Sequence, residues 1–252
     1  MTPWVQRLLI ANVLVFALQY FSPGVTSMLM FYPTEVLHRP WTLVTYMFVH
    51  GSIGHIFFNM LALYFFGPPV EQRMGENRFI TLYLISGIVG ALLSMVLGNP
   101  ILGASGAVMG VSLAFARFWP RQQILIWGVL PIEARWMVII YAAIDVLGFA
   151  GYGARGIANL AHLGGLAGAL LYLLFLERRQ GARRFKAATQ PRVADSTLGA
   201  WQKVDRNSIH AVNRDEVDRI LDKINASGIG SLTPQERQFL SNFVPPDDRK
   251  PA

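Results

Sequence analysis

No cysteine occurs in this 252-residue chain, so disulfides and thiolate metal sites are excluded at the outset. Charged side chains are also scarce, at 15% of the residues, whereas a soluble domain of this size carries roughly 25%. Hydrophobic residues make up 53%. This balance indicates a protein of the lipid bilayer. The net charge of +7 is therefore interpreted as membrane topology, and no nucleic-acid partner is expected.

The few charges are unevenly distributed along the chain. Of the 37 Lys, Arg, Asp and Glu residues, 13 lie in residues 1–176 and 24 lie in residues 177–252. We therefore expect a membrane domain over 1–176, followed by a soluble tail. The N-terminus lacks the basic lead and small-residue cleavage site of a signal peptide, so residues 5–21 are expected to be retained as a first span.

Six apolar stretches approach the roughly 20 residues that a helix needs to cross a bilayer. The sequence thus predicts an all-α membrane protein with a bundle of six transmembrane helices. The run "ILIWGVL" before the fifth span is placed at the membrane interface. The expected spans are 5–21, 55–70, 79–97, 105–119, 133–150 and 157–176.

Basic residues set the expected orientation. "ERRQGARRFK" follows the sixth span, and positively charged loops stay on the cytoplasmic side. Six spans then place both termini in the cytoplasm. No eukaryotic targeting feature is visible, so a prokaryotic inner membrane is the expected setting.

The loop between the first two spans, residues 22–54, is too apolar for a solvated linker and is broken by Pro33 and Pro40. Irregular backbone at membrane depth needs protein or water around it. We therefore expect this loop to lie against the bundle, partly sunk in the outer leaflet. An ordinary interfacial amphipathic loop is the alternative.

The tail is expected to have three parts. Residues 177–212 are basic and poor in apolar residues, which predicts a flexible linker. Residues 213–245 predict a small soluble αα-hairpin, whose second helix opens with a Thr233–Glu236 capping box. Residues 246–252 are expected to be a disordered end. A regulatory or stabilising appendage is favoured over a domain that binds a partner or a membrane surface, and the sequence names no partner for it.

Four polar side chains stand out in the predicted spans, all in the half nearer the outer face: His55, Asn59, Ser105 and His162. Asp145 in the fifth span is a further one. Such residues are costly in lipid and mark functional sites. His55 and Asn59 are four residues apart and share one helix face. A serine nucleophile needs an adjacent base, and neutral imidazole suits that role. Ser105 is the expected nucleophile and His162 the expected base, with oxyanion donors from His55, Asn59 and the Ser105 backbone N–H.

Small residues beside these side chains predict close helix contacts, because they let backbones approach in lipid. Two Gly-x-x-x-Gly pairs follow the predicted nucleophile and base, and Ala161 with Gly165 forms a parallel small-residue pair. Contact between the two spans would set Ser105 against His162. The glycines expected to pack at the site are Gly103, Gly106, Gly110, Gly164, Gly165 and Gly168.

A carboxylate to orient His162 is not evident from the sequence. Asp145 is the only acid deep in a predicted span, and nothing in its position places it beside His162. The pattern therefore favours a Ser–His dyad over a triad.

These residues resemble a known family. "HGSIGHIFFN", "GASG" and "AHLGG", in that order, resemble the motifs of the rhomboid intramembrane serine proteases, and "GPPVEQRMG" is similar to the family's Gly-Gly-x-x-x-Glu-x-x-x-Gly segment. The resemblance covers about residues 1–176. It implies a six-helix bundle, Ser105 as nucleophile, His162 as general base, and an oxyanion hole that includes His55 and Asn59. It further implies cleavage of membrane-spanning protein substrates near a small residue, with no cofactor.

Three positions depart from the family pattern. The first outer loop of the family commonly carries a Trp-Arg pair, whereas Arg39 and Trp41 stand here in the reverse order around a proline. Pro68 and Pro69 replace the usual glycine and predict a kink. Met109 occupies the position of a tyrosine that stacks on the catalytic histidine, so ring stacking is lost there.

Other classes of protein fit the sequence less well. Ser105 alone would favour a packing or N-capping role, and only the joint pattern favours a site. His50 and His55 are five apart without the glutamate of a His-Glu-x-x-His zinc site, so no metal is expected. A client-binding pseudoprotease would lack the serine or the histidine. A transporter would need polar residues through the full bilayer depth.

Overall fold

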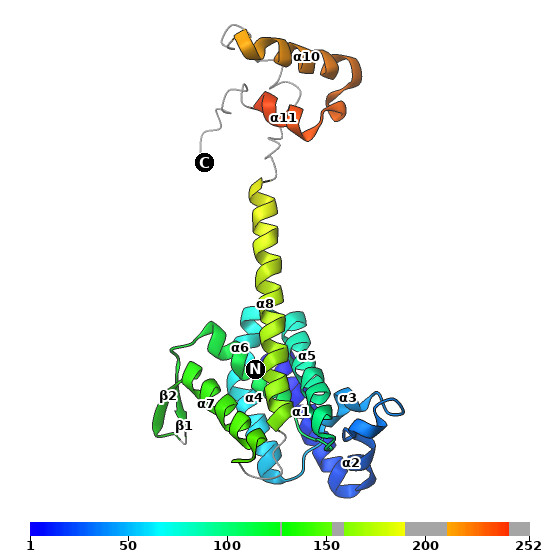
Figure 1. Ribbon diagram of the computed structural model, residues 1–252, viewed down its shortest axis with the longest axis vertical. Helices are drawn as coiled ribbons and strands as arrows, with labels where there is room; N and C mark the ends of the chain where they lie inside the picture. Colours follow the sequence, from blue (N-terminus) through cyan, green and yellow to red (C-terminus); the bar gives the residue numbers. More distant parts are fainter. Residues whose placement is uncertain (127, 153–158, 190–210, 242–252) are drawn as a thin grey trace. The chain divides into compact units, whose positions relative to one another are not determined.

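The computed structural model describes residues 1–126, 128–152, 159–189 and 211–241. The chain divides into two compact units, Met1–Arg178 and Arg179–Ala252. The first unit is a group of helices (Figure 1). They are α1 (Pro3–Phe21), α2 (Gly24–Leu29), α3 (Thr42–Thr45), α4 (Ile53–Met74), α5 (Glu76–Ser94), α6 (Ser105–Phe118), α7 (Ala134–Leu147) and the part of α8 (Asn159–Thr189) up to Arg178.

Five helical stretches are long and apolar enough to cross a membrane: Pro3–Phe21, Ile53–Met74, Glu76–Leu97, Ala134–Tyr152 and Asn159–Arg179. They match the expected first, second, third, fifth and sixth spans, although residues 157 and 158 lie outside the described residues. The expected fourth span is the shorter apolar helix α6, of 14 residues. At 1.5 Å per residue α6 is about 21 Å long, less than the ~30 Å hydrocarbon core. If α6 is embedded, at least one of its ends lies inside the bilayer.

The segment 98–104 before α6 is irregular, and its backbone groups bond to the loop between α1 and α4. Phe31 and Ile101 exchange both backbone hydrogen bonds, at 3.1 and 3.0 Å, and the Gly103 N–H donates to the Tyr46 carbonyl at 2.9 Å. Buried backbone polar groups need such partners, above all in lipid. The loop 22–54 thus lies against the bundle, as expected, and the turn into α6 is built on it.

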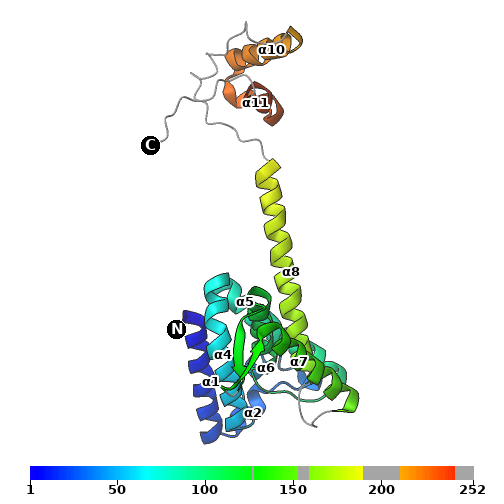
Figure 2. The ribbon, with the colours of Figure 1, turned by 90° about the vertical axis from the view of Figure 1, so that its left-hand side faces the viewer.

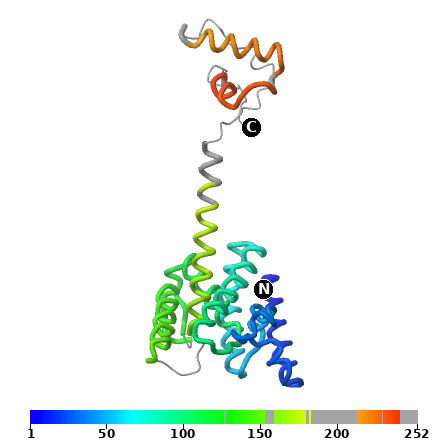
Figure 3. Tube along the Cα trace, turned by 45° about the vertical axis from the view of Figure 1, so that its right-hand side comes forward, coloured from blue at the N-terminus to red at the C-terminus, as the bar shows by residue number. Residues whose placement is uncertain are grey.

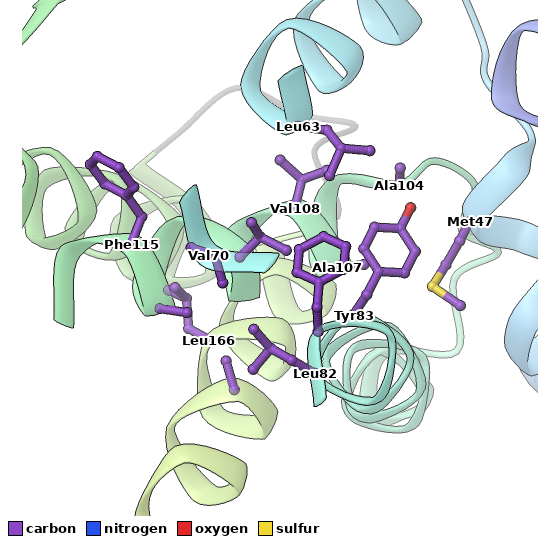
Figure 4. Close-up of a cluster of buried hydrophobic side chains, with 14 of the residues drawn as sticks. Met47, Leu63, Val70, Leu82, Tyr83, Ala104, Ala107, Val108, Phe115 and Leu166 are labelled. Atoms are coloured by element: carbon purple, nitrogen blue, oxygen red, sulfur yellow. The ribbon is translucent and has the colours of Figure 1, made fainter. Parts of the chain in front are cut away.

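The core of the first unit lies where α4, α5, α6 and the first turns of α8 meet. Figure 3 shows the lower turns of α8 running beside the other helices of this unit. The Tyr46 hydroxyl crosses from the loop to α5 and donates to the Gly87 carbonyl at 2.8 Å. The side chains that converge in Figure 4 include Met47, Leu63, Val70, Leu82, Tyr83, Ala104, Ala107, Val108, Phe115 and Leu166.

A short β-hairpin, which the sequence did not predict, lies between α6 and α7 in this mainly helical unit. β1 (Gln123–Ile126) and β2 (Leu130–Glu133) pair antiparallel, and the hairpin is visible in Figure 2. Gly128 has φ = 73°, a turn conformation that favours glycine. The run "ILIWGVL" contains most of β1 and the turn. Its apolar residues have no clear alternation, so the sequence pattern did not distinguish short strands from an interfacial segment.

Helix α4 continues through Pro68 and Pro69 and ends at Met74. The next residue, Gly75, adopts φ = 83° and terminates the helix. This last part of α4 carries Glu71, which is buried at 2% exposure. The Glu71 carboxylate accepts the backbone N–H groups of Trp4 and Val5 at 2.9 and 3.0 Å. Helix α1 has no acidic residue in its own first turn and no side-chain cap. The carboxylate from α4 therefore supplies the missing N-terminal acceptor and ties the two helices together.

The second unit contains α10 (Ala211–Ser227), a 3₁₀ turn (Ile229–Ser231) and α11 (Pro234–Ser241). Their apolar faces share one cluster of buried residues: Val217, Ile220, Ile224, Leu232 and Leu240. The predicted capping box is formed, since the Thr233 N–H donates to Glu236 at 2.8 Å and the Glu236 N–H donates to the Thr233 hydroxyl at 3.2 Å.

The expected linker begins too early. Helix α8 continues to Thr189, so residues 177–189 are helical. A basic helix and a flexible linker both have low apolar content, so the sequence pattern does not distinguish them. Residues 190–210 of the expected linker and the expected disordered end, 246–252, lie outside the described residues.

Replacing Glu71 with Gln should destabilise the first unit, because an amide offers one acceptor oxygen to two backbone donors and carries no charge. Hydrogen bonds to charged groups contribute about 1.5–3 kcal/mol each, so we expect a loss on the order of 2–4 kcal/mol. A lower thermal-unfolding midpoint in detergent would record it. Glu76→Gln, at the exposed start of α5, is the matched control. An unchanged midpoint for Glu71→Gln would contradict the capping role.

Acid should loosen α11. The Thr233 N–H and the ammonium of Lys223 lower the pKa of Glu236 from 4.5 to about 2. A carboxylate with a lowered pKa stabilises the folded state above its ordinary pKa, and that stabilisation is lost as the pH falls from about 4.5 towards 2. Hydrogen-exchange protection of α11 amides, corrected for intrinsic rates, should fall over this range. In Glu236→Gln the protection should be lower at neutral pH and vary less with pH; equal pH dependence would refute the assignment.

Candidate active site

Ser105 is the first residue of α6, at the end of a tight turn. Gly103 adopts φ = 113°, a conformation that other residues rarely take, and a Cβ there would lie 2.5 Å from the His55 ring. The "GASG" turn therefore needs glycine at this position for two reasons. It leaves the Ser105 hydroxyl at a helix N-terminus, where backbone N–H groups are unpaired within the helix.

His162 lies in the first turn of α8, with its Nε2 at 2.7 Å from the Ser105 Oγ. The contact depends on the close approach of α6 and α8. A Cβ on Gly106 would lie 3.0 Å from the Ala161 carbonyl oxygen, and one on Gly165 would overlap the Gly106 carbonyl. The small-residue pair formed by Ala161 and Gly165 thus faces α6. Ala161 directly precedes His162, and Gly165 lies three residues after it.

The second glycine pair of α8 packs elsewhere. Cβ atoms on Gly164 and Gly168 would meet α5, at the Val89 carbonyl and at the side chain of Val89. The expectation that the two Gly-x-x-x-Gly pairs face each other is therefore wrong. Successive helical residues point 100° apart, so Gly164 and Gly165 cannot both face α6. On α6, Gly110 packs against Ser86 of α5 and Ala169 of α8.

Asp145 lies beside His162, and the expectation that no carboxylate orients this histidine is wrong. The Asp145 Oδ1 is 3.0 Å from the His162 Nδ1, on the ring edge opposite Ser105. Asp145 belongs to the last turn of α7 and is 3% exposed. Its other oxygen, Oδ2, has no hydrogen-bond partner among the described residues. Sequence spacing gave no sign of this contact, because it depends on how the chain returns between α7 and α8.

The two predicted oxyanion residues lie on α4. His55 is in its first turn, held by a hydrogen bond from its N–H to the Ser52 hydroxyl at 3.1 Å, and its ring rests against Gly103. Asn59, one turn on, is 7% exposed, and its Nδ2 has no hydrogen-bond partner among the described residues. A buried amide donor without an acceptor is costly, unless a ligand provides one.

His50 was considered in the sequence only as a metal ligand, and it has a structural place in the site. It is 2% exposed, and its Nε2 accepts the N–H of Ala104 at 3.4 Å. Gln19 fixes its backbone through two hydrogen bonds, at 3.0 and 3.1 Å. Burial and the neighbouring His55 lower the pKa of His50 to about 4. The ring therefore stays neutral and keeps a lone pair for Ala104.

The arrangement joins a hydroxyl, an imidazole and a carboxylate in one chain of hydrogen bonds, drawn from α6, α8 and α7. An imidazole in this position can take the proton of the hydroxyl. Across the described residues no three His, Cys, Asp or Glu side chains gather as metal ligands would. The hydroxyl, the imidazole and the carboxylate are the parts that nucleophilic chemistry by side chains uses.

The sequence of this chain is similar to those of known proteins. A family model described as the Rhomboid domain matches residues 37–179, more than half of the chain. The chain belongs to the rhomboid family. This assignment and the apolar helices make the protein an integral membrane protein. A second model, described as a family of unknown function (DUF6576), matches residues 205–243.

The chain is similar to several named rhomboids over part of their length. It is 44% identical over 71 residues to Rhomboid protease GluP of Bacillus subtilis, covering 28% of this chain and 14% of that protein. It is 34% identical over 105 residues to the mitochondrial Rhomboid protein 1 of Saccharomyces cerevisiae, covering 38% and 30%. The putative rhomboid protease YdcA of Bacillus subtilis is 35% identical over 74 residues, covering 28% and 37%. The chain thus spans well under half of these relatives.

A single methyl group between α6 and α8 should disrupt this rhomboid site. In Gly165→Ala the new Cβ would overlap the Gly106 carbonyl, so the helices must separate and the contact between Ser105 and His162 must lengthen. We expect at least a tenfold loss of reactivity of Ser105 towards a fluorophosphonate probe. Gly54→Ala is the control, because a Cβ on this exposed helical glycine meets nothing within 4 Å. Full labelling of Gly165→Ala would show that the packing is not required.

Proposed function

We propose that this rhomboid is a serine endopeptidase that cleaves membrane-spanning protein substrates with Ser105 as nucleophile and His162 as general base. The 2.7 Å contact between the Ser105 Oγ and the His162 Nε2 carries the proposal. Ser105 is only partly buried. A serine that merely packs between helices does not need an imidazole beside its hydroxyl, whereas a serine nucleophile needs an adjacent base. The named relatives include rhomboid proteases, which supports the same class of reaction.

In the proposed reaction, the Ser105 Oγ attacks the carbonyl carbon of the scissile peptide bond while its proton passes to the His162 Nε2. The carbonyl oxygen becomes an oxyanion, for which the Asn59 Nδ2, the His55 ring and the Ser105 backbone N–H are the proposed donors. The Asn59 donor supports this assignment, since it has no other partner among the described residues. The protonated imidazole then gives its proton to the leaving amine, and a water molecule hydrolyses the acyl-enzyme by the same steps.

The proposed topology has six spans with both termini in the cytoplasm, and α6 as the short fourth span. A helix of 14 residues is too short to cross the ~30 Å hydrocarbon core, which supports a Ser105 that lies below the outer surface. Cleavage would then fall within or near the outer leaflet, close to a small residue of the substrate. The proposed setting is a prokaryotic inner membrane. The unit that contains α10 and α11 would form a soluble cytoplasmic appendage.

A rhomboid-like pseudoprotease that binds membrane clients is the second candidate. Such a protein has no need for a hydrogen-bonded serine and histidine, and a buried polar pair has an energetic cost in lipid. The contact between Ser105 and His162 therefore favours the enzyme.

Cleavage of a model single-span substrate in liposomes tests the proposal. Wild type should cut the substrate, and Ser105→Ala and His162→Ala should each lose at least a thousandfold in rate, because neither side chain has a substitute at its position. A fluorophosphonate probe should label only Ser105. Equal cleavage by Ser105→Ala would refute the nucleophile. Capture of the substrate without cleavage by wild type would support the pseudoprotease.

A further inference from the structure

We propose that Asp145 is the third member of the site, a positioning residue that fixes the tautomer and orientation of His162. The inference rests on the proposed protease function and extends it from a dyad to a triad. Its basis is the pair of contacts on opposite edges of one imidazole, 3.0 Å to the carboxylate and 2.7 Å to the hydroxyl.

A neutral imidazole carries one proton, and only one of its two tautomers satisfies both contacts. A carboxylate accepts hydrogen bonds and donates none, so the proton must be on the His162 Nδ1 facing Asp145. The Nε2 then carries the lone pair and accepts the Ser105 hydroxyl, as a general base must. With the proton on Nε2 instead, the carboxylate would face a lone pair, and the base would be blocked.

Burial strengthens the effect of this carboxylate. Asp145 is 3% exposed, and its Oδ2 has no hydrogen-bond partner among the described residues, so His162 is the polar side chain placed to compensate its charge. A buried carboxylate is costly without such compensation. The compensation is greatest when the imidazole is protonated, as it becomes when it takes the proton of Ser105. Asp145 therefore stabilises the transition state more than the resting enzyme.

The fold holds Asp145 in this place through the contact between the end of α7 and the start of α8. A Cβ on Gly148 would overlap the amide of Asn159, so the two chain segments touch there. The Gly148 N–H also bonds to the Asp145 carbonyl, which keeps the last turn of α7 formed.

The competing explanation is that Asp145 only bridges α7 and α8 structurally. The Asp145→Asn variant distinguishes this explanation from a positioning role. The amide is isosteric and can hold the helices together by accepting or donating one hydrogen bond, but it does not select the tautomer. The corresponding change in a serine protease lowers kcat about 10⁴-fold with intact geometry. We expect a fall in kcat on the order of 10²–10⁴-fold, with KM and the thermal-unfolding midpoint close to wild type. Ser112→Ala, which removes a buried hydroxyl of α6 that bonds to the Val108 carbonyl, should keep full kcat.

The tautomer can also be measured without turnover. Nitrogen-15 NMR of histidine-labelled wild type in detergent, at alkaline pH and with His162→Ala to assign the signal, should show the Nδ1-protonated form of His162. Asp145→Asn should raise the fraction of the Nε2-protonated form. A wild-type His162 protonated on Nε2 would overturn the inference, even if Asp145→Asn does not fold. An unchanged kcat in Asp145→Asn would also overturn it.

These readouts distinguish the two proposals. If wild type neither cleaves nor reacts with a fluorophosphonate while His162 still holds the Nδ1 proton, the protease function fails and the positioning by Asp145 stands. If wild type cleaves and Asp145→Asn cleaves equally fast, the protease works with a Ser–His dyad and the role proposed for Asp145 is wrong.

Discussion

The site depends on one contact between backbones, the approach of α6 to α8 across Gly106, Ala161 and Gly165. In lipid there is no hydrophobic drive to bring two helices together, so close packing of small residues has to supply the attraction. The same small residues determine the distance. With the backbones this close, the first residue of α6 and a residue in the first turn of α8 come within a hydrogen bond of each other, Ser105 to His162 at 2.7 Å. The reactive pair follows from the helix packing.

A second constraint acts on the chain before Ser105. A nucleophile at the start of a short helix requires irregular backbone just ahead of it, and a membrane offers no water to satisfy that backbone. Here the loop between α1 and α4 provides the partners, through Phe31, Tyr46 and the side chain of His50. The sequence predicts that this loop lies against the bundle, with an ordinary interfacial loop as the alternative. Its apolar side chains are needed because it is an internal scaffold, and Gln19 of α1 fixes it from the other side.

Sequence reasoning reached the parts of the site that have a local signature. A polar residue in an apolar span is costly, and a glycine beside it favours close packing, so Ser105, His162 and Gly103 carry a signal in the sequence. The choice between Gly164 and Gly165 as the residue facing α6 could not, because it depends on the rotation of α8. Neighbouring glycines differ by 100° on a helix, and the sequence has no other mark of that angle. The β-hairpin was missed because four-residue strands carry too few positions for a period to be read.

Asp145 shows why a residue can be visible in a sequence and still be undervalued. A carboxylate in a membrane span is energetically costly, and that cost already indicated a function. The partner that compensates it, His162, lies on the next helix, and the sequence spacing does not determine how the chain connects the two. The contact with His162 has a larger energetic effect here than it would have in water. In a low dielectric, an unpaired charge costs more and the attraction between paired charges is stronger. A carboxylate that is compensated best by imidazolium is placed to act during the reaction. The helix α7 is then part of the site.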